Sequence, residues 1–174
     1  MTTKWPRPPL NDASFRELAL HYAARYATSK ARLTAYLRRK LKERGWEGEE
    51  AADPDALVQR MADLGYVDDA GFARMKGASL SRRGYGPRRI AQALTGAGIV
   101  GADRAEAEEE ASAAIWAAAD AFARRKRIGP YAASPPDRDQ RERMIAAFLR
   151  AGHSHATARA WVDASPGDPP DPDR

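Results

Sequence analysis

The chain has 174 residues, a formal net charge of +5 and no cysteine, and its length suits one ordinary domain or a short array of repeats. Alanine occurs 37 times while valine and isoleucine together occur nine times, which argues against a sheet because strands favour β-branched residues and helices favour alanine. The absence of cysteine excludes disulfides and thiolate metal sites, and the longest apolar run, Ala113–Ala119, is too short to span a membrane.

Before the first expected helix the chain carries three prolines and little periodicity, so we expect residues 1–13 to be a disordered arm. The first helix is predicted over residues 14–26 from its four-residue apolar spacing. Ser29 then caps a second helix, and Gly45 ends it in a left-handed conformation. The start of the chain lacks the apolar core of a signal peptide, so we expect a cytoplasmic protein.

Proline, glycine and capping residues mark the remaining helices. Each predicted start places a short polar residue or glycine just before the helix that follows. The predicted starts are Asp53–Pro54, Asp68, Gly86–Pro87, Asp103, Asp137 and Ser154. The alanine-rich stretch after Asp103 is long enough for one helix or two. The last ten residues contain four prolines, so residues 165–174 are expected to be a disordered tail.

A pattern of apolar residues and glycine recurs three times along the chain. Each copy has two apolar residues four apart, a glycine four residues further on, and then one more side chain. The copies are Leu37, Leu41, Gly45 and Trp46; Ile90, Leu94, Gly98 and Ile99; and Met144, Phe148, Gly152 and His153. A regular period of this length is typical of a modular helical array, in which each unit is stabilised by packing on its neighbours.

Charge is segregated along the chain. Residues 30–44 and residues 74–89 each carry a net charge of +6, whereas residues 47–69 carry −7 and residues 103–110 carry −4. Such segregation suits docking onto a polyanionic or charge-patterned partner, although each run alone is also typical of a solvated helix face. Candidate partner-binding residues lie in the two basic runs: Arg82, Arg83, Arg88 and Arg89, and Arg38, Arg39, Lys40 and Arg44.

The first of these sets, Arg82, Arg83, Arg88 and Arg89, is named the arginine cluster and surrounds a predicted helix start. Cations near the amino end of a helix oppose its dipole, so local stability does not explain them. Together with the backbone N–H groups of that helix start, they are predicted to hold phosphates or carboxylates of a partner. A third basic run, residues 124–127, also suits the carboxyl end of a helix and is the weaker candidate.

Two stretches, residues 64–73 and residues 82–99, resemble the core of the RecX family of recombination regulators. The first reads Leu-Gly-Tyr-Val-Asp-Asp-Ala-Gly-Phe-Ala and the second begins Arg-Arg-Gly-Tyr-Gly-Pro-Arg-Arg-Ile. The first repeat agrees at Ser29–Leu33, Leu37–Leu41 and Gly45. The resemblance implies an all-α fold of three tandem three-helix repeats that form an elongated, curved array.

The implied repeats cover residues 14–67, 68–114 and 115–164. The resemblance also implies a function: binding to the RecA nucleoprotein filament, with DNA inside the filament as a second partner. The implied effect is modulation, mainly inhibition, of RecA's recombinase, ATPase and coprotease activities in homologous recombination, DNA repair and the SOS response. We expect a monomer that does not engage a membrane.

Other functions fit parts of the sequence. Short three-helix units with basic second helices are compatible with a direct DNA-binding helix-turn-helix protein, although interspersed acids leave a net charge of only +5. An enzyme is not expected, because no nucleophile has a paired base at a recognisable spacing. The three histidines lack cysteine or carboxylate partners at ligand spacing, so we predict no metal and no cofactor.

Overall fold

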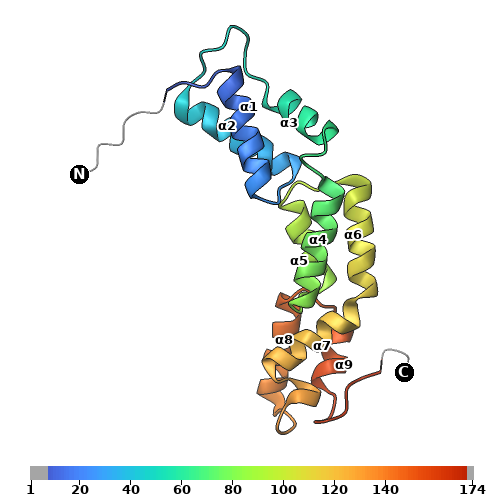
Figure 1. The fold of residues 1–174 in the computed structure, drawn as a ribbon. Coiled ribbons are helices and arrows are strands. Elements are labelled where there is room, and N and C mark those ends of the chain that lie inside the picture. Colours follow the sequence, from blue (N-terminus) through green and yellow to red (C-terminus); the bar gives the residue numbers. More distant parts are fainter. Residues whose placement is uncertain (1–7, 172–174) are drawn as a thin grey trace, which may run out of the picture. The chain divides into compact units, whose positions relative to one another are not determined.

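The computed structural model describes residues 8–171, and within that range the chain is all-α, as its alanine excess predicts (Figure 1). A 3-10 turn, Gly129–Tyr131, lies between the seventh and eighth helices. The α-helices are α1 (Asp12–Arg25), α2 (Lys30–Arg44), α3 (Pro54–Asp63), α4 (Asp69–Arg82), α5 (Pro87–Thr95), α6 (Gly101–Ala113), α7 (Ile115–Lys126), α8 (Arg138–Arg150) and α9 (His155–Val162). No helix of the described residues is long and apolar enough to cross a membrane.

The described residues divide into two compact units. The first unit ends at Phe72 and also includes Ala97–Ile99, and the second contains Ala73–Gly96 and the residues from Val100 onward. In the first unit α1, α2 and α3 all contact one another. Their shared core consists of Leu10, Phe15, Ala19, Leu33, Leu37, Val58, Met61 and Val67.

The expected disordered arm over residues 1–13 is wrong for its described end. Leu10 is fully buried in the first unit. Its N–H donates to the carbonyl of Gly45 over 3.0 Å, and its own carbonyl accepts from the N–H of Glu47 over 2.9 Å. Burial of one apolar side chain and two backbone hydrogen bonds therefore fix this segment. The rest of the expected arm, residues 1–7, lies outside the described residues.

Most of the predicted helix starts are confirmed. The side chains of Ser29, Asp53, Asp137 and Ser154 each accept a hydrogen bond from an N–H group in the first turn that follows. The predicted cap at Asp103 is wrong, because α6 already begins at Gly101 and Asp103 lies inside its first turn. There its negative charge still suits the helix dipole. The alanine-rich stretch forms two helices, which meet at Ala114.

The repeated glycines all have a positive φ angle. Gly45, Gly98 and Gly152 have φ angles of +79°, +73° and +94°, a region in which a Cβ atom is strained. Each therefore reverses the chain after the middle helix of its repeat. Of the equivalent apolar positions, Leu94 and Phe148 are fully buried, whereas Leu41 is only partly buried against the core of the first unit.

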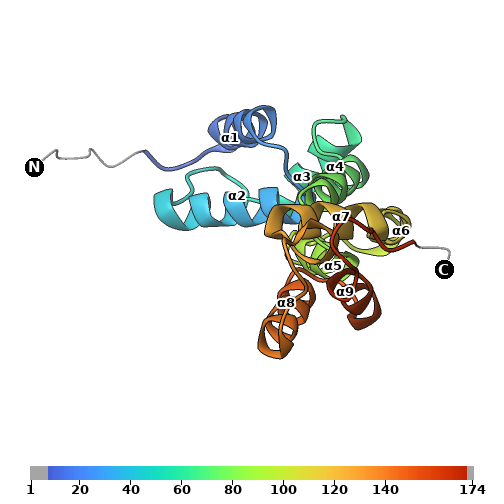
Figure 2. The ribbon, with the colours of Figure 1, turned by 90° about the horizontal axis from the view of Figure 1, so that it is seen from below.

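The carboxyl-terminal helices of the second unit enclose a separate core. Helix α9 contacts both α7 and α8, and Figure 2 shows α8 and α9 side by side beneath α7. Phe122 and Phe148 meet edge to face in this core, with ring centroids 4.6 Å apart. In the described part of the expected disordered tail, the N–H of Gly167 donates to the carbonyl of Pro130 over 2.9 Å, so this part of the tail is anchored. Residues 172–174 lie outside the described residues.

Candidate partner-binding site

The arginine cluster spans the turn between α4 and α5. Helix α4 ends at Arg82, and α5 begins at Pro87. All four side chains are exposed. None of the ion pairs among residues 8–171 involves them, and Arg83 lies over the ring of Tyr85 at 5.4 Å from its centroid. Exposed guanidinium groups without a carboxylate partner retain their capacity for charge-assisted hydrogen bonds.

Close packing against the α8–α9 turn fixes the backbone of this segment. The N–H of Gly86 donates to the carbonyl of Ala151 over 2.9 Å, and the N–H of Arg88 donates to the carbonyl of Gly152 over 3.2 Å. A Cβ atom on Gly86 would lie 2.5 Å from the carbonyl oxygen of Gly152, and one on Gly84 would lie 2.7 Å from the backbone nitrogen of Phe122. Only glycine permits these approaches, so the Gly-Tyr-Gly motif is explained by packing.

This packing corrects the expectation that backbone N–H groups at the start of α5 hold an anion. The N–H of Arg88 is already bonded to the carbonyl of Gly152, and those of Arg89 and Ile90 donate to the carbonyl of Gly86. The carboxyl end of α8 therefore meets the amino end of α5, an arrangement that the two helix dipoles favour. An anion at this site would therefore be bound by the arginine side chains and not by the backbone.

The helix dipoles disfavour only part of the arginine cluster. Arg88 and Arg89 lie in the first turn of α5, where a cation opposes the dipole. Arg82 lies in the last turn of α4, where a cation is favourable. Local stability therefore accounts for Arg82 but not for Arg88 and Arg89.

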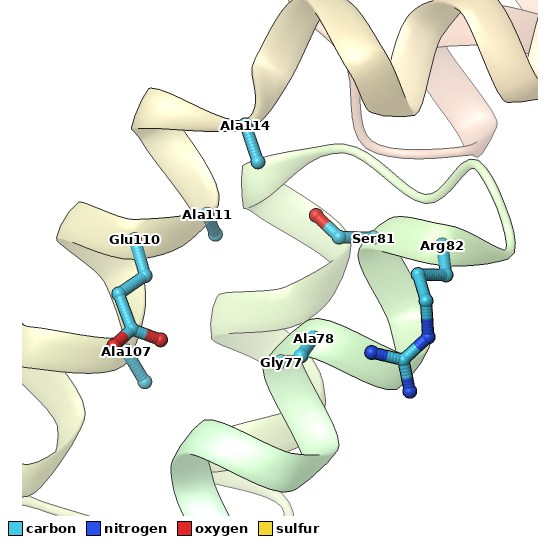
Figure 3. A pocket seen from close by; sticks show the side chains of 8 residues that line it. All are labelled: Gly77, Ala78, Ser81, Arg82, Ala107, Glu110, Ala111 and Ala114. Carbon is cyan, nitrogen blue, oxygen red and sulfur yellow. The ribbon is translucent and has the colours of Figure 1, made fainter.

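A shallow groove adjoins the arginine cluster between α4 and α6 (Figure 3). Its volume is about 280 Å³, and its floor is built from small residues on both helices. Arg82 lies on the α4 side and Glu110 on the α6 side, and neither forms an ion pair within the described residues. The buried hydroxyl of Ser81 has no hydrogen-bond partner there. The groove thus offers opposite charges across an apolar floor.

The second predicted set lies in the first unit and is neutralised only in part. Arg38 pairs with Asp55 over 2.6 Å. Arg39 and Lys40 both pair with Glu43. The Nε of Arg44 donates to the carbonyl of Pro8 over 2.9 Å. Every member of this set thus has a local partner, whereas the arginine cluster forms no ion pair within residues 8–171.

The third basic run, at the carboxyl end of α7, is also engaged in part. Arg124 donates to Asp120 and to the hydroxyl of Tyr131. The hydrogen bond from that hydroxyl to Asp120 raises the pKa of Tyr131, and burial adds to this increase. Arg125 donates to the carbonyl of Arg83. Arg125 therefore links the end of α7 to the backbone of the arginine cluster.

Asp68, Asp69 and His153 have structural roles. Asp68 accepts from the N–H of Gly71 over 3.0 Å, and Asp69 accepts from the N–H of Lys30 over 2.8 Å. His153 is fully buried against Phe122 and Phe148. Within residues 8–171 no group of three or more histidine, aspartate or glutamate side chains is placed to hold a metal ion.

Burial lowers the pKa of His153 from its ordinary value of 6.5, against a smaller opposite effect of its hydrogen bond to the carbonyl of Gly84. Between pH 6.5 and this lowered pKa, the unfolded chain binds a proton that the folded chain does not bind. The free energy of unfolding should therefore fall as the pH falls below 6.5, by at most about 1.4 kcal/mol per pH unit. Urea unfolding at about pH 7.5 and about pH 5.5 measures this loss, which His153→Gln should reduce; an equal loss in both proteins contradicts the assignment.

Sequence reasoning missed an aromatic surface on the first unit. Tyr22 and Tyr36 stack with ring centroids 4.2 Å apart, and the ring of Tyr26 lies 5.1 Å from that of Tyr22. The four-residue spacing of Tyr22 and Tyr26 was visible, but it fits an ordinary buried face equally well. The approach of Tyr36 from α2 is a tertiary contact that no local pattern reveals.

Comparison with known proteins gives a consistent result. Residues 68–107 match the family model described as "RecX, second three-helix domain". The "Regulatory protein RecX" of Myxococcus xanthus is 37% identical over 162 residues, which cover 85% of this chain and 83% of that protein. A protein of the same name from Thermus thermophilus is 37% identical over 81 residues, covering 47% of this chain and 54% of that protein.

A solved structure shares the fold. The crystal structure of RecX from Lactobacillus salivarius superposes with a TM-score of 0.59 at 17% sequence identity, covering 84% of this chain and 90% of that chain. At this identity the likeness concerns the fold alone. It confirms the all-α arrangement of tandem helical repeats that the recurring glycine pattern predicted.

Proposed function

The chain belongs to the RecX family of regulatory proteins, and from this membership we propose that it binds the RecA nucleoprotein filament and mainly inhibits its recombinase, ATPase and coprotease activities. It acts by contact, as a monomer, in DNA repair and the SOS response. Its principal partner is RecA, and DNA within the filament is a second partner.

The observation that carries this proposal is the arginine cluster. Arg88 and Arg89 are exposed, lack ion pairs within residues 8–171 and occupy a helix end where their charge is locally unfavourable. Their backbone is held rigidly by the α8–α9 turn. Rigid placement reduces the entropy lost on binding, so such side chains suit recognition of carboxylates or phosphates on a filament.

The inhibitory effect is proposed to arise from occupation of the filament surface. A protein bound there changes the assembly and turnover of RecA subunits and the access of co-substrates. The groove between α4 and α6 extends the contact with one charge of each sign, Arg82 and Glu110. A partner that presents protein charges as well as DNA phosphates would contact both of these side chains.

Cosedimentation tests the proposal against the helix-turn-helix alternative. The protein is mixed with RecA filaments assembled on single-stranded DNA, or with the same DNA alone, at increasing salt. We expect the protein to pellet with filaments at salt concentrations that release it from bare DNA, because binding through phosphates alone weakens steeply with salt. Equal retention on both, with the same salt dependence, would support direct DNA binding instead.

A further inference from the structure

Three tyrosines and several cations meet on one face of the first unit. They surround a hollow of about 420 Å³ between α1 and α2, named the tyrosine patch. It is lined by Tyr22, Tyr26 and Tyr36 and by Arg25, Arg39 and Lys40. Arg39 and Lys40 belong to the second predicted set, whereas the three rings have no part in the proposed contact with RecA.

The rings form a platform with a fixed base and a free outer member. Tyr22 and Tyr36 stack at an interplanar angle of 25° and also pack against the core of the first unit. Tyr26 lies beside Tyr22, with ring centroids 5.1 Å apart, but is 50% exposed and does not belong to that core. Tyr26 therefore presents an aromatic surface to solvent from a rigid support.

Cations surround this platform. The guanidinium of Arg25 lies 5.8 Å from the centroid of the Tyr26 ring. The guanidinium of Arg39 and the ammonium of Lys40 lie 5.5 and 5.8 Å from the centroid of Tyr36. Glu43 pairs with Arg39 and Lys40, whereas Arg25 forms no ion pair within the described residues. The exposed His21 completes the rim.

We propose that the tyrosine patch binds single-stranded nucleic acid, with one base stacked on Tyr26 and the neighbouring phosphates held by Arg25 and Arg39. Unpaired bases expose the flat faces that aromatic side chains stack on, while cations follow the backbone. A duplex hides those faces, and an acidic peptide would use the cations but leave Tyr26 without a role. This binding does not depend on RecA, so it stands apart from the regulatory function.

Fluorescence anisotropy of a labelled oligothymidylate of about twelve nucleotides, a length within the usual site sizes, tests the proposal with the full-length protein and no RecA. Tyr26→Ala should weaken binding about 5- to 150-fold, the range expected for loss of one base–aromatic stack, and Tyr26→Phe should restore it. Tyr66→Ala is the matched control, because Tyr66 is a comparably exposed tyrosine of the first unit, at 56%. Arg25→Gln, which keeps all three rings, should weaken binding and reduce its salt dependence.

Three outcomes would overturn the proposal. An abasic oligomer of the same length that binds as tightly shows that stacking contributes nothing. Equal affinities of Tyr26→Ala and Tyr66→Ala, with helicity unchanged, place the site elsewhere. Displacement of the oligomer by polyglutamate, equally from wild type and from Tyr26→Ala, identifies the patch as a surface for an acidic protein. Failure of this proposal leaves the cosedimentation result with RecA filaments unaffected.

Discussion

Replacing Phe148 with alanine is expected to lower the free energy of unfolding by about 3–5 kcal/mol. Phe148 is fully buried, and the centroid of its ring lies 4.6 Å from that of Phe122 and 5.3 Å from that of His153. Truncation therefore removes buried apolar area, leaves a cavity and abolishes two edge-to-face contacts. Urea unfolding followed by circular dichroism measures the loss.

The neighbouring residue supplies the control. Leu149 lies on the same helix but is 38% exposed, so Leu149→Ala should change the free energy of unfolding much less. If the two variants lose the same stability, the repeat position assigned to Phe148 is wrong. Leu94→Ala, at the equivalent position of the second repeat, should cost about 2–5 kcal/mol because Leu94 is also fully buried.

Arg88→Glu/Arg89→Glu should raise the concentration needed for half-inhibition of RecA about tenfold or more, because a hydrogen bond to a charged group contributes about 1.5–3 kcal/mol and about 1.4 kcal/mol is tenfold. Stability should change little, because carboxylates suit the dipole of α5 while the adjoining carboxyl end of α8 opposes them. Arg82 is left unchanged, because reversing its charge would oppose the dipole of α4.

Lys126→Glu/Arg127→Glu is the charge-matched control. Both residues are exposed at the end of α7, and neither forms an ion pair within residues 8–171. Because their reversal opposes the dipole of α7, the comparison is made at a temperature at which both variants are folded. The two double variants change the net charge equally. Inhibition and thermal unfolding are measured for both. If both variants lose inhibition equally, bulk electrostatic attraction is sufficient to explain binding. If Arg88→Glu/Arg89→Glu inhibits as well as the wild type, the arginine cluster is only a solvent-exposed surface and does not bind RecA.

Short-range sequence patterns were sufficient to predict most of the fold. Asp53 with Pro54, and Ser29, mark helix starts because a side-chain cap and a fixed proline φ act within a single turn. Gly45 and Gly152 mark chain reversals because their positive φ excludes most other residues. The helix start predicted at Asp103 was wrong because a capping pattern can also occur in the first turn of a helix, where a negative charge likewise suits the helix dipole.

Features that depend on tertiary contacts could not be predicted from the sequence. Nothing near Leu10 indicates that it pairs with Gly45 and Glu47 across the first unit. The arginine cluster was visible along the chain, but which of its members lack local compensation depends on where α4 ends and on the carbonyl of Gly152. The neutralisation of Arg38 by Asp55 likewise requires α2 and α3 to be packed together.

Hydrolysis of ATP by RecA on single-stranded DNA tests the proposed regulation most directly. The wild-type protein is added in substoichiometric amounts to filaments at steady state, and the rate is followed against its concentration. We predict that the rate falls well before the protein equals RecA in concentration, because a molecule that changes filament assembly, as proposed, would affect more than the subunit it contacts. A rate that stays unchanged up to equimolar folded protein would contradict the proposed inhibition of RecA.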